Sequence, residues 1–81
     1  MEYQVHDGVP YEIDVLSLAH GDDVAIELTD MSPDGGVLAE VRVSSRLVSP
    51  VHQEPMPVEV FAWWSAIVVA TARALTETDE P

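Results

Sequence analysis

Carboxylates are the side chains most able to carry chemistry in this sequence. The chain of 81 residues has 15 Asp and Glu but only 3 Arg and no lysine, which gives a formal charge of -12. Carboxylates can ligate cations, form acid–base pairs or contact a basic partner. Because the chain has no cysteine, disulfides, thiolate zinc sites and cysteine nucleophiles are excluded.

Two polar segments have residue types suited to a metal ion. Asp30–Gly35 resembles the first half of a calcium loop, but the twelfth position is Val41 where such a loop needs a bidentate acid. A hairpin turn is therefore the favoured interpretation. His20 precedes Asp22 and Asp23 without a second histidine at ligand spacing. We predict no metal and no cofactor.

Four other carboxylates, Glu12, Asp14, Glu27 and Glu40, alternate with apolar residues. In a strand meander they share one sheet face, with Arg42 as the local counter-charge. Like charges on neighbouring strands destabilise a sheet, so such a face suits high salt or a basic partner. An acid–base pair needs a cleft, which a flat sheet face does not provide. No Gly-x-Ser-x-Gly elbow occurs either, so we predict no catalytic residues and no enzyme.

Alternating apolar residues and turn signals predict the elements that position these carboxylates. The expected class is α+β, with a three- to four-stranded antiparallel meander and one C-terminal helix packed on it, in a single domain over residues 1–76. Strands are predicted at about 2–5, 11–18, 24–30 and 37–46, with Asp7-Gly8 as a hairpin turn. Pro50, Pro55 and Pro57 predict a linker over 48–57. A helix at about 57–75 and a frayed acidic tail at 77–81 follow.

The predicted helix is apolar around more than one side. Trp63 and Trp64 are adjacent and point about 100° apart, so we expect one in the core and one at an interface. Both are candidate partner-binding residues, and a homodimer through this helix would cover the remaining apolar side. The uncharged run Val60–Ala72 is shorter than the ~20 residues that span a bilayer, so the sequence favours a buried helix over a membrane anchor.

These patterns favour a small acidic protein–protein interaction module whose partner has a basic surface. Such a chain should repel nucleic-acid phosphates, which fits an inhibitor or antitoxin-like protein that covers a basic nucleic-acid-binding site. The alternative is a structural or assembly subunit from a halophilic source, whose acidity is solvent adaptation. A tail-anchored membrane accessory protein is a third class. The opening residues are polar and acidic, without a secretory signal, and we expect a cytoplasmic protein.

Overall fold

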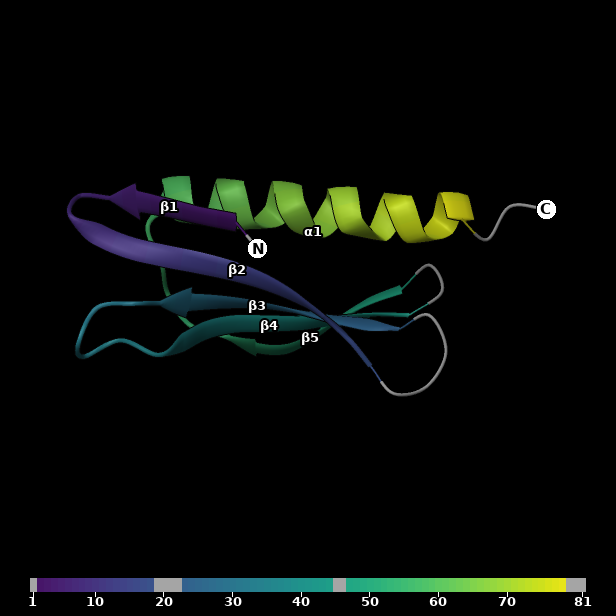
Figure 1. The fold of residues 1–81 in the computed structure, drawn as a ribbon, viewed down its shortest axis with the longest axis horizontal. Helices are drawn as coiled ribbons and strands as arrows, with labels where there is room; N and C mark the ends of the chain where they lie inside the picture. The colour runs from purple at the N-terminus through teal and green to yellow at the C-terminus, as the bar shows by residue number, and fades with distance from the viewer. Residues whose placement is uncertain (1, 19–22, 45–46, 79–81) are drawn as a thin grey trace.

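The chain folds into one antiparallel sheet covered on one face by a helix (Figure 1). The computed structural model describes residues 2–18, 23–44 and 47–78. Its elements are β1 (Glu2–His6), β2 (Val9–Ser17), β3 (Val24–Asp30), β4 (Val37–Ser44), β5 (Leu47–Gln53) and α1 (Val58–Thr78). The strands lie in sequence order, each antiparallel to the next. The α+β class, the antiparallel meander and the C-terminal helix are therefore confirmed.

The first hairpin turns where the sequence predicts it. Asp7 and Gly8 join β1 to β2 with φ of 50° and 79°. Two successive residues with positive φ are typical of a type I′ turn, whose twist matches that of the strands. Glycine adopts this conformation without steric cost, and aspartate tolerates it better than most residues.

The β3–β4 turn is closed by hydrogen bonds within Asp30–Gly36. Asp30 Oδ1 accepts from Ser32 N at 2.9 Å and from Ser32 Oγ at 2.6 Å. The Gly35 amide donates to the Ser32 carbonyl at 2.9 Å, and the Asp30 amide donates to the Gly36 carbonyl at 2.9 Å. The segment that resembles half a calcium loop is therefore a hairpin turn.

The sheet has five strands, and the prediction of three to four was wrong because β5 occupies the first half of the predicted linker. Pro50 has no N–H to donate, but β5 is an edge strand, where proline is tolerated. Pro50 also pairs with Val41 next to a register shift between Glu40 and Val41, and irregularities of this kind accommodate proline. Only residues 54–57 then connect the sheet to α1.

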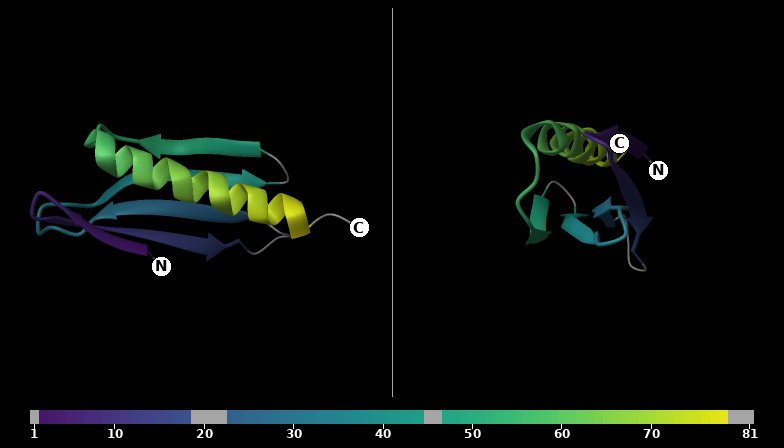
Figure 2. Two further views of the ribbon diagram at one scale, coloured as in Figure 1. Left: turned by 90° about the horizontal axis from the view of Figure 1, so that it is seen from above. Right: turned by 90° about the vertical axis from the view of Figure 1, so that its left-hand side faces the viewer.

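α1 crosses the sheet obliquely, and seen along its length β3, β4 and β5 lie beneath it while β1 rises to its level (Figure 2). The helix begins after Pro57, whose carbonyl accepts the Phe61 amide at 2.9 Å. Glu59 lies in the first turn, where its charge complements the positive end of the helix dipole. The helix continues to Thr78, three residues beyond its predicted end.

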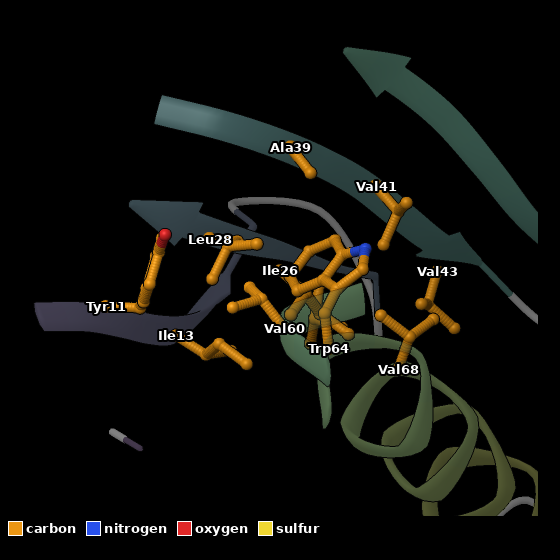
Figure 3. Close-up of a cluster of buried hydrophobic side chains, with 11 residues drawn as sticks. Tyr11, Ile13, Ile26, Leu28, Ala39, Val41, Val43, Val60, Trp64 and Val68 are labelled. Carbon is orange, nitrogen blue, oxygen red and sulfur yellow. The ribbon is translucent and has the colours of Figure 1, made fainter. Parts of the chain in front are cut away.

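The core lies between α1 and β2–β4, with Trp64 at its centre (Figure 3). Val60, Trp64 and Val68 recur every four residues, which places them on one side of the helix. They pack against strand residues that the alternation assigned to this face, and Ile26, Leu28 and Val43 there are all 0% exposed. No polar residue is buried within the described part of the chain.

Alternation with the buried residues Ile13 and Ala39 predicts that Val15 and Val37 point inward, but both are exposed. Val15 lies two residues beyond Ile13, the last residue of β2 that pairs with a described residue of β1. Val37 pairs with Thr29 across a register shift at the start of β4. Leu38, which the alternation placed outward, is half-buried against the core. The shift therefore changes which side chain packs inward.

The β3–β4 turn provides a test of this structure. A Cβ at Gly35 would overlap the Asp30 carbonyl oxygen and lie 2.6 Å from its Oδ1, whereas a Cβ at Gly36 would have nothing within 4 Å. We expect Gly35→Ala to lower the free energy of unfolding by about 1–3 kcal/mol, because backbone would have to move. Urea unfolding followed by tryptophan fluorescence measures the loss. Gly36→Ala is the matched control, and equal losses in the two variants would contradict the turn geometry.

Candidate functional site

Strand pairing aligns three of the four predicted carboxylates in one row across the sheet. Asp14 on β2 lies directly opposite Glu27 on β3, and Glu27 lies directly opposite Glu40 on β4. Glu12 lies two residues along β2 from Asp14, opposite Thr29. Because these residues alternate with core residues, they project from the face away from α1. We call Glu12, Asp14, Glu27 and Glu40 the acidic row.

The acidic row has little counter-charge near it. Directly opposite residues in a sheet have Cβ atoms about 4.5–5.5 Å apart, and like charges at that distance repel. Arg42 lies opposite Ala25 and Ser49 rather than opposite a carboxylate. Among the described residues Arg42 makes no ion pair. The four half-buried carboxylates therefore form a concentrated negative surface.

One end of the row meets a histidine that already has a partner. His52 on β5 lies opposite Glu40, but its Nε2 is 2.8 Å from Glu54 Oε2. His52 and Glu54 are both about half exposed, with side-chain exposures of 46% and 51%. Exposed pairs of this kind contribute little to stability. The pair directs the histidine toward Glu54 and leaves the Glu40 carboxylate available to a partner.

The described His, Asp and Glu side chains are not grouped as metal ligands. Within residues 2–18, 23–44 and 47–78, no group of three or more His, Asp or Glu side chains is arranged to hold an ion. Of the other sequence candidates, His20 and Asp22 lie outside the described residues, and Asp23 immediately precedes β3. Asp30 already accepts two hydrogen bonds from Ser32. Its carboxylate is part of the turn.

The two tryptophans have different environments. Trp64 is 2% exposed and lies in the core, while Trp63 is half-buried and packs against the edge of the core. A partner that contacts this folded form can therefore reach Trp63 but not Trp64. If one of the two tryptophans contacts a partner, as the sequence predicts, that residue is Trp63.

The outer side of α1 forms a second candidate surface. Val58 is 83% exposed, Phe61 47% and Val69 45%. By length and composition, the helical segment Val58–Leu75 is apolar enough to cross a membrane. The core helix of a soluble protein can meet the same criterion. In this structure, 17% of the segment is buried. Exposed apolar surface of this extent is typical of an interface.

A third exposed feature, the β5 edge, was missed at the sequence level. Leu47 is 69% exposed, Val48 44% and Val51 53%. The apolar residues flanking Pro50 were a signal for this strand, but the nearby prolines favoured a linker. Pro50 has no N–H, and proline in an edge strand is one of the features that disfavour edge-to-edge pairing.

The chain matches no protein-family model, no curated protein and no solved structure. Its function is therefore inferred from the chemistry of the acidic row and of the outer side of α1.

Repulsion within the acidic row can be measured directly. Glu27 has a carboxylate opposite it on each side, so we expect Glu27→Gln to raise the free energy of unfolding by about 0.2–1 kcal/mol in dilute buffer. The gain should vanish in ~1 M KCl, where the screening length is about 3 Å. Glu2→Gln is the control, because Glu2 is exposed and pairs with Ile13. Chemical unfolding at both salt concentrations tests this, and a salt-independent gain would refute the repulsion.

Proposed function

We propose that this protein is a non-enzymatic interaction module that binds a basic protein surface through the acidic row. The observation that carries the proposal is the direct alignment of Asp14, Glu27 and Glu40 on adjacent strands. Such an arrangement lowers the stability of the free protein, since the charges repel. Arg or Lys side chains of a partner would relieve that repulsion and form charge-assisted hydrogen bonds.

The finer proposal is that the basic surface is a nucleic-acid-binding site, which the module covers as an inhibitor or antitoxin-like protein does. Adjacent strands lie about 4.8 Å apart, so the row repeats negative charge at regular intervals, as a phosphate backbone does. The net charge of -12 adds long-range attraction to a basic target and speeds association. The same charge disfavours direct contact with nucleic acid.

The test compares two variants of equal net charge. The first neutralises the acidic row with Glu12→Gln, Asp14→Asn, Glu27→Gln and Glu40→Gln. The second neutralises four exposed carboxylates elsewhere, with Glu2→Gln, Asp7→Asn, Asp34→Asn and Glu54→Gln. The probe is an arginine-rich peptide that binds a single-stranded oligonucleotide.

We expect the unaltered protein to bind the peptide and displace the oligonucleotide. The row variant should lose binding by at least ~30-fold, corresponding to about 0.5 kcal/mol for each of four exposed ion pairs, while the control variant should lose much less. Calorimetry gives the affinities, and oligonucleotide fluorescence anisotropy gives the displacement. Equal losses in the two variants would mean that net charge alone attracts the peptide, and the proposed site would be wrong.

A second candidate is a structural or assembly subunit adapted to high salt. It is favoured by exposed carboxylates on other parts of the molecule, such as Glu2 on β1, Asp34 in the β3–β4 turn and Glu59 on α1. Charge dispersed in this way keeps a protein soluble where salt screens repulsion. It does not require a basic partner.

Salt dependence of folding tests this second candidate. If acidity is solvent adaptation, the thermal midpoint should rise by 10 °C or more between dilute buffer and molar KCl, roughly the effect of 2 kcal/mol in a domain of this size. Circular dichroism records the transition, and sodium sulfate serves to separate screening from general salting-out. A midpoint that changes by only a few degrees would exclude this adaptation as the main reason for the charge.

A further inference from the structure

We propose that α1 pairs antiparallel with α1 of a second copy of this chain, about a two-fold axis that passes beside Ala66. This pairing uses the side of the molecule opposite the acidic row, so it is independent of the proposed binding of a basic partner. The outer side of α1 would be covered by the same side of α1 in the second copy.

The outer side of α1 is shaped for close approach of another helix. Ala62, Ala66, Ala70 and Ala74 recur every four residues and are all exposed. Small residues at this spacing let two helix backbones approach closely. The larger exposed side chains Val58 and Val69 flank them, and half-buried Trp63 lies on the other flank. A second helix laid along the alanines would therefore contact apolar surface on both sides.

Charge complementarity identifies the occupant as a second copy. Glu59 and Arg73 are the only charged residues between Val58 and Leu75, and each lies seven residues from Ala66. Seven residues are close to two helical turns, about 10 Å, so both charges lie on the face of Ala66, one toward each end. Both are exposed, and neither makes an ion pair among the described residues.

The two helices attract each other through Glu59 and Arg73 only when they are antiparallel. About a two-fold axis at Ala66, Glu59 of each copy faces Arg73 of the other, and Ala62 of each faces Ala70 of the other. The interface is then isologous, with every contact made twice. A parallel pair would instead place Glu59 against Glu59 and Arg73 against Arg73, which is repulsive.

A membrane is the other possible occupant of this apolar surface, but α1 is already committed to the sheet. Inserting α1 into a bilayer would withdraw Val60, Trp64 and Val68 from the core and expose Ile26, Leu28 and Val43. Pairing with a second copy leaves that core intact. It also covers the side of α1 that the sheet does not reach.

The experiment reverses each charge and measures self-association of the full chain by sedimentation equilibrium. Glu59→Arg places Arg against Arg73 at both ends of the dimer, and Arg73→Glu places Glu against Glu59. We expect each variant to weaken dimerisation roughly tenfold, as the loss and reversal of two exposed ion pairs would. An equimolar mixture of the two variants should form a heterodimer, and the double variant Glu59→Arg/Arg73→Glu should recover the affinity of the unaltered chain.

Matched controls separate specific pairing from net charge. Asp34→Arg changes the net charge as Glu59→Arg does, and Arg42→Glu changes it as Arg73→Glu does, but Asp34 lies in the β3–β4 turn and Arg42 on the sheet face away from α1. Since Glu59→Arg reduces overall negative charge, general repulsion predicts stronger association, whereas the proposed register predicts weaker association. Circular dichroism establishes that each variant is folded. Ala66→Arg, which places like charges at the two-fold axis, should abolish the dimer without touching either helix end.

A chain that stays monomeric at every concentration would overturn the proposal, as would a dimer indifferent to the charge reversals. Flotation with neutral phospholipid vesicles distinguishes a membrane, since a monomer that floats with them would assign the outer side of α1 to lipid. These results are separate from those of the arginine-rich peptide. A chain that binds the peptide but does not self-associate would overturn the dimer alone. A chain that self-associates but does not bind the peptide through the acidic row would overturn the basic-partner proposal alone.

Discussion

The burial of one side of α1 against β2–β4 is the contact on which the rest of the structure depends. Val60, Trp64 and Val68 supply the helix side of the core, and Trp64 is its largest member. Each fully buried side chain of this kind contributes about 1.5–3 kcal/mol, a large share of the stability of a domain this small. Without α1, both faces of the sheet would be wet, and the strands would have no apolar layer to fix their register.

That single contact also determines which surfaces remain for function. One helix covers one sheet face, so the opposite face is free to carry the acidic row. The helix in turn is left with an uncovered apolar side. The two surfaces differ in chemistry and lie on opposite sides of the core, so the charge that suits one does not disturb the other.

Much of this fold could be predicted from alternation and turn chemistry. Val24, Ile26, Leu28, Ala39, Val41 and Val43 are buried as their spacing predicts. β5 could not be predicted, because proline disfavours a strand unless the strand lies at an edge, and edge position depends on the topology. The shared face of Glu12, Asp14, Glu27 and Glu40 followed from alternation, but the direct opposition of Asp14, Glu27 and Glu40 depends on register. Trp63 and Trp64 could not be assigned from sequence, because both positions lie within the broad apolar arc of the helix.

The negative charge of the acidic row would not prevent self-association through α1, because the two rows of a dimer would lie far apart. In a back-to-back dimer the layers would run sheet, helix, helix, sheet, with spacings of about 10 Å between sheet and helix and 8–10 Å between helices. The two acidic rows would therefore face outward about 30 Å apart. The screening length at physiological ionic strength is only ~8 Å, so repulsion between the rows would scarcely oppose pairing. Each row would stay accessible, so one dimer could hold two basic partners, one on each outer sheet face.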